Sequence, residues 1–222
     1  MCTQLNIADR IERLLQEDGF RTWGFVIYRC TYKSDSDWEE FMHRFLSQVE
    51  RKLKFYNGLD MLESLASTVL EDQSRFDNAS ASVIREHFQK WVSTAPQEEQ
   101  GIPSEEAVFK NSGRYKFCLM VNEEALQSVL NAPPPEDIND SGYVILVNGQ
   151  WKPEVLTEDE LAAYDSPPDE DFYDPIEGST LRDVGWMKVF YDQAVINSFV
   201  YMGDRFDWDR EYRRPPDIGL KF

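Results

Sequence analysis

The chain has 222 residues, of which 23 are basic and 41 acidic, so its formal net charge is −18. Hydrophobic residues make up 41% and aromatic residues 14% of the chain, which is too much apolar content for a wholly disordered protein. The length can bury a sizeable core, and no apolar run approaches the roughly 18 residues that a membrane span needs. The charge argues against nucleic acids and anionic membrane surfaces as partners.

The N-terminus and the cysteines indicate a cytoplasmic, intracellular protein. Residues 1–19 have no uninterrupted apolar stretch, and acidic residues appear early, so they predict an amphipathic helix and not a secretory signal. Cys30 and Cys118 lie inside apolar, strand-like runs. The three cysteines, with Cys2, do not have the spacing of metal ligands. We therefore expect buried free thiols in a reducing compartment, with a disulfide as the alternative.

The first half of the chain is predicted from its apolar spacing. A capping box at Ser36 and Glu39 opens a helix whose apolar stripe centres on Phe45, which we expect in the core. A run of β-branched and aromatic residues is typical of a central strand that is covered on both faces. The predicted elements are a helix at 6–17, this strand at 23–32, the capped helix at 37–55, and helices at 60–71 and 80–93.

The second half begins with a polar stretch that contains prolines and glycines, and we expect a mobile loop there, at 94–113. Asn122 is placed to cap a short helix, and Asn148-Gly149 is a strong hairpin signal. Residues 193–202 fit a helix or a strand. The remaining predictions are strands at 114–121, 142–147 and 185–191 and a helix at 123–130.

Half of the net charge lies in one segment. Residues 151–180 hold ten acidic side chains and one basic side chain, and ten minus one gives −9, half of the total of −18. We expect a mobile, solvated acidic segment over 153–180, parts of which dock on the body through their apolar residues. A docking site for a basic partner and a cation site are the alternatives.

The element order predicts a single α+β domain over 1–222. Two strand-helix halves joined by a helical insertion are typical of a ferredoxin-like sandwich. The right-handed crossover rule then places the helices 37–55 and 123–130 on one face of the sheet.

Arg29 interrupts an otherwise apolar strand, so its charge must be paired or reach the sheet edge. One interpretation is a structural ion pair, with a carboxylate within hydrogen-bonding reach. The other is a ligand or partner site at the end of the strand with Tyr28 or Tyr32. Alternation puts Tyr28 and Tyr32 on one face and Arg29 on the other.

The C-terminal tail concentrates aromatic and guanidinium groups, with Trp208, Arg213 and Arg214 as candidate binding residues. This composition is common in recognition surfaces. A terminal arm that locks onto an acidic body needs the same groups, and we favour that intramolecular interpretation.

The sequence contains no recognisable motif for a metal, a cofactor or a catalytic nucleophile. His43 has Glu39 and Glu40 before it, and His87 has Glu86 beside it on a different face of the helix; we interpret both as ordinary helix histidines and predict no metal site. The chain lacks Gly-x-Gly-x-x-Gly, the Walker sequence and the Gly-x-Ser-x-Gly elbow, and we predict no cofactor. Spacing alone leaves a Ser-His-Asp triad or a Cys-His pair open.

Several sequence features share a resemblance. They are the run Trp23–Tyr32, Asp37-Trp38, the pattern Gly185–Val189, Trp208, and Arg213–Pro216. Together they resemble a family of uncharacterised proteins from filamentous fungi, over most of the chain. The resemblance implies a fungal source and supplies no activity, cofactor or catalytic residue.

Two functions follow from these observations. The first is an intracellular acidic protein that acts through protein–protein contacts, as a homodimer or with another protein. The alternative is a cofactor-independent enzyme or binding protein for a small neutral molecule, of the isomerase or cyclase type, with an aromatic-lined pocket and Tyr, Asp or Glu as acid and base. A filled core with an exposed apolar patch would favour the first, and a deep cavity holding a carboxyl with a raised pKa the second.

Overall fold

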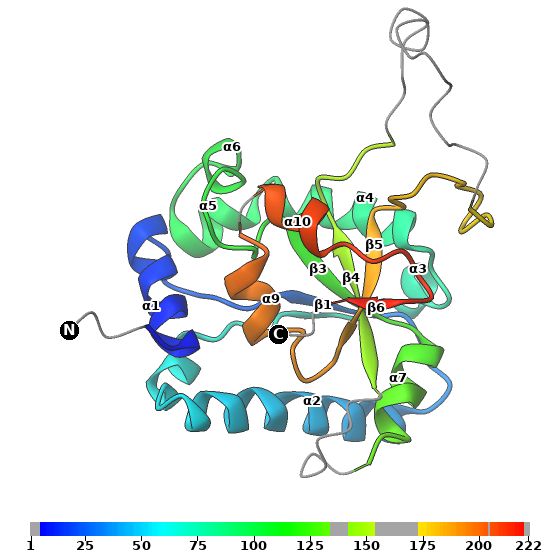
Figure 1. Cartoon of the computed structure of the whole chain (residues 1–222), viewed down its shortest axis with the longest axis horizontal. Helices are drawn as coiled ribbons and strands as arrows, with labels where there is room; N and C mark the ends of the chain where they lie inside the picture. Colours follow the sequence, from blue (N-terminus) through cyan, green and yellow to red (C-terminus); the bar gives the residue numbers. More distant parts are fainter. Residues whose placement is uncertain (1–4, 134–141, 154–172, 204, 220–222) are drawn as a thin grey trace, which may run out of the picture.

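A computed structural model describes residues 5–133, 142–153, 173–203 and 205–219. The protein is of the mixed α+β class, with a six-stranded sheet of order β2-β1-β3-β4-β5-β6 that helices cover on both faces (Figure 1). The strands are β1 (Val26–Arg29), β2 (Val69–Leu70), β3 (Phe117–Val121), β4 (Tyr143–Asn148), β5 (Trp186–Phe190) and β6 (Ile218–Gly219).

The strand pairing is mixed. β1 pairs in parallel with both β2 and β3, β4 is antiparallel to β3 and β5, and β6 is parallel to β5. The ferredoxin-like layout is not confirmed, because β1 and β3 pair directly, whereas a split βαβ unit leaves space for a strand between them. The segment between the two strand-helix halves is mainly helical, as predicted, but it also supplies the edge strand β2.

The helices begin where polar side chains accept the free backbone N–H groups. Asn6, Ser34, Ser80 and Asn122 each accept such a bond at a helix start. The helical elements are α1 (Ile7–Asp18), α2 (Asp35–Phe55), η1 (Leu59–Ser64), α3 (Gln73–Phe76), α4 (Ala81–Val92), α5 (Ala95–Gln100), α6 (Ser104–Ala107), α7 (Glu123–Leu130), α9 (Ile196–Tyr201) and α10 (Arg205–Glu211). None of the described helices is long and apolar enough to cross a membrane.

The predicted layering is confirmed. α2 and α7 lie on one face of the sheet, and α4 lies on the other (Figure 1). Arg44 of α2 joins the first pair, because its guanidinium donates to the backbone oxygen of Leu130 at 2.9 Å. The chain therefore passes from β1 to β2 on one side of the sheet and from β2 to β3 on the other.

Three predictions are wrong. Residues 60–71 form the 3₁₀ helix η1 and the strand β2, because the backbone pairs with β1 from Thr68, whose oxygen accepts from the Ile27 amide at 2.8 Å. Residues 94–113 contain the helices α5 and α6 and are not a continuous loop. The predicted capping box at Ser36 is also wrong, because the side chain that caps α2 belongs to Ser34 and accepts from the Asp37 amide at 3.2 Å.

The Asn148-Gly149 signal marks a turn but not a two-residue hairpin. The Gly149 amide donates to the backbone oxygen of Lys116 at 2.8 Å, and the chain leaves the sheet after this turn. The antiparallel partner of β4 is β5, which starts only at Trp186. For the ambiguous residues 193–202, the structure shows the helix α9.

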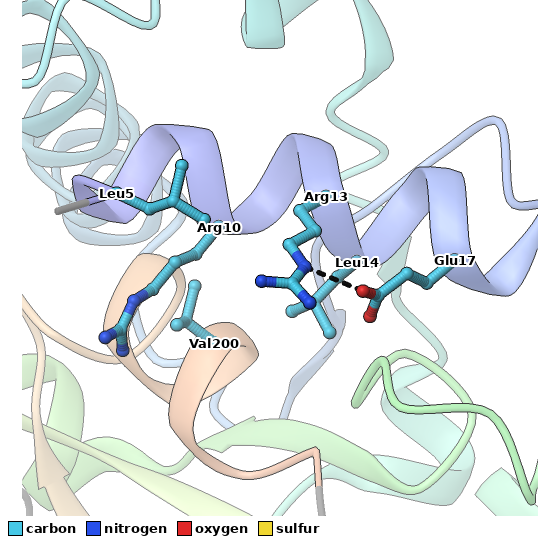
Figure 2. A pocket seen from close by; sticks show the side chains of 6 residues that line it. All are labelled: Leu5, Arg10, Arg13, Leu14, Glu17 and Val200. Carbon is cyan, nitrogen blue, oxygen red and sulfur yellow. Dashed lines mark hydrogen bonds and ion pairs between the residues drawn. The ribbon is translucent and has the colours of Figure 1, made fainter. Parts of the chain in front are cut away.

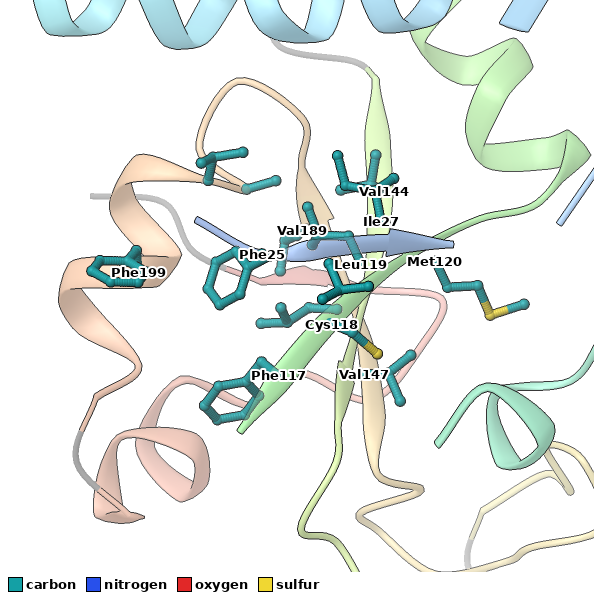
Figure 3. Packing of buried hydrophobic residues seen from close by; sticks show 14 of the residues in the cluster. Phe25, Ile27, Phe117, Cys118, Leu119, Met120, Val144, Val147, Val189 and Phe199 are labelled. Atoms are coloured by element: carbon teal, nitrogen blue, oxygen red, sulfur yellow. The ribbon is translucent and has the colours of Figure 1, made fainter. Parts of the chain in front are cut away.

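One hydrophobic core runs from α1 to Tyr212. Figure 3 shows how side chains of β1, β3, β4 and β5 meet beside Phe199 of α9. Phe45 is 1% exposed, which confirms its predicted core position. Trp23, Phe25 and Tyr28 are also fully buried, so the aromatic groups around β1 fill the core.

Candidate functional site

The predicted site at the carboxyl end of β1 is a compact ionic cluster. Arg29 is 5% exposed. Its Nη2 donates to Asp35 Oδ1 at 2.5 Å, at the start of α2, and its Nε donates to the backbone oxygen of Thr31 at 2.9 Å. The prediction that a buried Arg29 has a carboxylate within hydrogen-bonding reach is therefore confirmed.

Two aromatic rings enclose the same guanidinium. Its carbon lies 4.5 Å from the ring centre of Tyr32 and 5.3 Å from that of Trp38. Glu71 lies 3.8 Å from Nη1 and accepts the Trp38 indole N–H at 2.9 Å. These contacts occupy the guanidinium on several sides, so they favour the structural interpretation of Arg29, which ties β1, β2 and α2 together.

Tyr28 and Tyr32 do not share one site. β1 ends at Arg29, so strand alternation no longer places Tyr32, whose ring turns toward Arg29. Burial of the Tyr32 hydroxyl raises its pKa, against the lowering effects of the Asp72 backbone and the charge of Arg29. The Tyr28 hydroxyl instead bonds His87 Nδ1 of α4 at 2.9 Å.

The Tyr28–His87 pair is a hydrogen bond between a buried tyrosine and a half-buried histidine. Burial raises the pKa of Tyr28, and burial together with the charge of Arg75 lowers the pKa of His87. The Phe76 ring meets both rings edge to face, at 5.2 and 5.0 Å. The pair therefore fills and satisfies the core between β1 and α4, as expected for an ordinary helix histidine.

The predicted tail residues serve mainly to hold the chain together. Trp208 is buried, stacks on Phe117 with ring centres 5.6 Å apart, and donates its indole N–H to Asp183 Oδ2 at 2.7 Å. Arg214 donates to the backbone oxygens of Leu181 and, at 2.6 Å, Asp174. These contacts support the intramolecular interpretation of the tail.

Arg213 differs from the other two tail candidates. Its Nη1 donates to backbone oxygens of the tail itself, those of Arg210 at 3.1 Å and Tyr212 at 2.8 Å. It therefore orders the tail locally.

The acidic segment can be followed only at its C-terminal end, because residues 154–172 lie outside the described part of the chain. The Arg214 guanidinium lies 4.9 Å from the ring centre of Tyr173. Glu177 accepts the Ala81 amide at 3.0 Å, at the start of α4. This end of the segment therefore docks on the body, as the sequence analysis expects of parts of it.

A pocket that the sequence analysis did not identify lies between α1 and α9 (Figure 2). Its volume is about 390 Å³. Ile7, Ile11 and Leu15 of α1 are buried in the core, and the short helix α9 lies beside α1. The pocket lies between the two helices. The lining residues are Leu5, Arg10, Arg13, Leu14, Glu17 and Val200.

The two arginines of this pocket have different partners. Arg13 Nε pairs with Glu17 Oε1 at 2.7 Å, one helical turn away. The Arg10 guanidinium lies 5.3 Å from the ring centre of Tyr201 and has no carboxylate within ion-pair distance in the described residues. Four of the lining residues lie on the predicted helix at 6–17. The pocket cannot be predicted from the sequence, because its other wall is α9 and residues 193–202 fit a helix or a strand.

Exposed apolar side chains adjoin the pocket where α1 begins and α2 ends. Asn6 donates its side-chain amide to the backbone oxygen of Tyr56 at 3.1 Å, so the two helix ends are neighbours. Leu5 and Leu59 are 42% and 43% exposed, and Phe55 is 81% exposed. We call the pocket residues together with Phe55 and Leu59 the α1 surface.

Two further predictions concern the cysteines and metal binding. Cys30 and Cys118 are buried free thiols, as predicted, and burial raises the pKa of Cys30 to about 12. In the described ranges, no group of three or more His, Cys, Asp and Glu side chains could hold a metal ion.

Comparison with family models, with curated proteins and with solved structures found no match.

Proposed function

We propose that this protein acts through contacts with another protein, and that the partner docks on the α1 surface. The observation that carries the proposal is Arg10, a cation that lines the pocket beside Leu14 and Val200 and has no carboxylate partner among the described residues. The partner segment that fits carries a carboxylate next to an apolar side chain. Leu14 and Val200 take the apolar group, and Arg10 takes the carboxylate.

The energetics favour such a mixed segment. Burial of apolar area contributes about 25 cal/mol per Å² of favourable free energy. A partner that covers the exposed apolar side chains of this surface therefore gains binding free energy. Arginine is enriched at interface centres because its planar fork can bind a carboxylate through two hydrogen bonds. The tightly filled core around β1 and the exposed apolar groups of the α1 surface also satisfy the condition that favours an interaction protein.

The distribution of charge determines where the partner segment can bind. The chain carries −18, so carboxylates of a partner are repelled from most of the protein. Arg10 is a local exception, and like-charge repulsion elsewhere penalises other placements of the same segment. Two copies of this chain repel one another for the same reason, so we propose a different protein as the partner and not a homodimer.

The experiment is a selection of random peptides on the full-length chain. Enriched peptides should share an Asp or Glu beside an apolar residue, and Arg10→Gln should weaken their binding about tenfold, as expected for the loss of a charged hydrogen bond. Val200→Asp should abolish it. Arg75→Gln is the matched control, because Arg75 is an exposed helix arginine in a local pair with Asp72.

The outcomes separate the occupants of the surface. Enriched peptides without an acidic residue, or peptides that bind Arg10→Gln as tightly as the unchanged chain, would overturn the proposal. Sedimentation of the chain alone would reveal a dimer, and a dimer that Arg10→Gln dissociates would make a second copy the occupant instead.

A further inference from the structure

A second cavity, of about 570 Å³, lies where the chain leaves β4 and returns to β5. It is separate from the α1 surface and shares no residue with it. Two short segments form its wall, one just after the turn that follows β4 and the other just before β5. The lining residues are Trp151, Lys152, Pro153, Leu181, Arg182 and Asp183.

Arg85 of α4 joins the two segments from below. Its Nε donates to the backbone oxygen of Asn148 at 3.0 Å, and its Nη2 donates to that of Gly185 at 2.9 Å. Its guanidinium carbon lies 4.6 Å from the ring centre of Trp151. The indole that lines the cavity is thus backed by a buried cation that is itself fixed to the ends of β4 and β5.

Gly185 is required for this arrangement. Its φ is +76°, and a Cβ there would lie 2.4 Å from Arg85 and 2.5 Å from the Trp151 ring. A side chain at this position would therefore both strain the backbone and push the indole away. The packing of glycine, arginine and tryptophan gives the cavity a rigid, flat wall.

Asp183 is held just as firmly. Its Oδ1 accepts the Gly185 amide at 2.7 Å, and its Oδ2 accepts the Trp208 indole N–H at 2.7 Å. Burial raises the pKa of this carboxyl, against the hydrogen bonds from Gly185 and Trp208. The tail residue Trp208, a candidate binding residue in the sequence analysis, thereby positions an acid in the wall of the cavity.

Two cations complete the cavity. Lys152 and Arg182 are exposed, and neither makes an ion pair with another described residue. Arg214 donates to the backbone oxygens of Leu181 and, at 3.4 Å, Arg182, so the segment that carries Arg182 is fixed to the tail. A flat ring, two cations without an ion pair in the described residues and an immobilised carboxyl therefore line one space of ordinary ligand size.

We propose that this cavity binds a small organic anion with a flat, apolar ring system. The ring lies against the Trp151 indole, and the anionic group is bound by Lys152 and Arg182. Asp183 accepts a hydrogen bond from a donor group of the ligand through a lone pair that its protein contacts leave open. This is a small-molecule function in addition to the protein contact at the α1 surface, and it revises the sequence-based expectation of a neutral ligand.

The test uses three probes and calorimetry on the full-length chain. 2-Naphthoate has both the ring and the charge, 2-naphthamide keeps the ring without the charge, and cyclohexanecarboxylate keeps the charge without the flat ring. We expect 2-naphthoate to bind at least about tenfold more tightly than either analogue, and to lose this affinity as salt is added.

Charge variants then locate the site. Lys152→Gln with Arg182→Gln should weaken 2-naphthoate about tenfold or more, whereas Lys33→Gln with Arg21→Gln, the same charge change at other exposed positions, should leave it unchanged. Trp151→Leu should weaken it as well, and if that variant unfolds, the exposed charge variants still decide. Equal affinity for naphthoate and naphthamide, or full affinity in the Lys152/Arg182 variant, would overturn the proposal. Peptide binding at the α1 surface is a separate measurement, so either proposal can fail alone.

Discussion

Arg29 and Arg114 are both buried guanidinium groups beside the parallel strands, yet their surroundings differ. Arg114 is 0% exposed and forms a bidentate pair with Glu99 of α5, at 2.8 Å from Nε and 2.7 Å from Nη2. Its Nη1 also donates to the backbone oxygens of Gly24 and Ala66, at 3.1 and 2.9 Å. The principal partner of Arg29, Asp35, has a side chain that is 84% exposed.

The exposure of the partner therefore matters as much as the burial of the cation. The Arg114 side chain is 0% exposed and that of Glu99 only 26%, so Arg114 would stay buried and charged if Glu99 were removed. Asp35 is already in water and loses little without Arg29. Breaking a buried pair is costly because it leaves an uncompensated charge, whereas an exposed pair contributes little.

The largest effect is expected for Glu99→Ala. It leaves Arg114 charged and fully buried, so the free energy of unfolding should fall by about 3–5 kcal/mol, measured by urea denaturation. Glu98→Ala is the matched control, because Glu98 is the exposed neighbour in the same helix, and we expect a change within about 0.5 kcal/mol. A loss below about 1 kcal/mol for Glu99→Ala would mean that water reaches Arg114 and that the two arginines are equivalent.

Phe45→Ala gives an apolar scale for the comparison. Phe45 stacks on Phe41 with ring centres 5.6 Å apart, and its removal should cost about 3–5 kcal/mol through lost burial and the cavity that remains. Leu46→Ala, at the exposed neighbour in α2, should cost less than about 1 kcal/mol. Similar losses for the two variants would contradict the placement of the α2 stripe against the sheet.

A pH series sharpens the comparison further. Burial of Glu99 acts to raise its pKa, but the hydrogen bonds and charge of Arg114, with a hydrogen bond from Tyr115, together lower the pKa below its ordinary value of 4.5. A carboxyl with a lowered folded-state pKa stabilises the fold above its unfolded-state pKa, and this contribution is lost as the pH falls through the folded-state value. The stability difference between the unchanged chain and Glu99→Gln should therefore shrink below about pH 4.5. A difference that stays constant down to the acid transition would show that Glu99 does not gain from its partner.

Sequence patterns were sufficient where one element carries its own signal. The long helix α2 and the Asn122 cap of α7 lie where predicted, and β1 and β3 lie inside the predicted strands 23–32 and 114–121 but are shorter. Even the carboxylate near Arg29 follows from sequence, because a charge inside an apolar strand requires a partner.

Features that depend on contacts between distant segments were not predictable in this way. β2 has a helical apolar pattern but pairs with β1, so tertiary hydrogen bonding overrides the local preference. Glu99 lies in a polar stretch without apolar periodicity, and its role appears only when Arg114 is placed beside it. The cavity at Asp183 likewise joins segments that flank β4 and β5, which no local pattern connects.

The smallest effect is expected for Arg29→Met, and it decides between the two interpretations of this residue. Methionine has a similar length and can lie between the rings of Tyr32 and Trp38, where sulfur–aromatic contacts are favourable. Asp35 and Glu71 remain exposed to water, so no buried charge is left unpaired. Replacement of such a pair by an apolar side chain is often neutral, and we expect the free energy of unfolding to change by less than about 1 kcal/mol.

Binding measurements on the same variant complete the test. If Arg29 is structural, peptides selected on the α1 surface and 2-naphthoate should bind Arg29→Met as they bind the unchanged chain, because neither site includes this residue. If Arg29 instead serves a site at the end of β1, its removal should raise stability while a binding activity is lost, as is common at functional positions. Thermal unfolding separates these results, because only the interpretation as a site predicts a rise in stability, and the unchanged titrations with both probes show that the variant is folded. A loss of several kcal/mol would contradict both interpretations, since it would mean that Asp35 and Glu71 depend on Arg29 as strictly as Arg114 depends on Glu99.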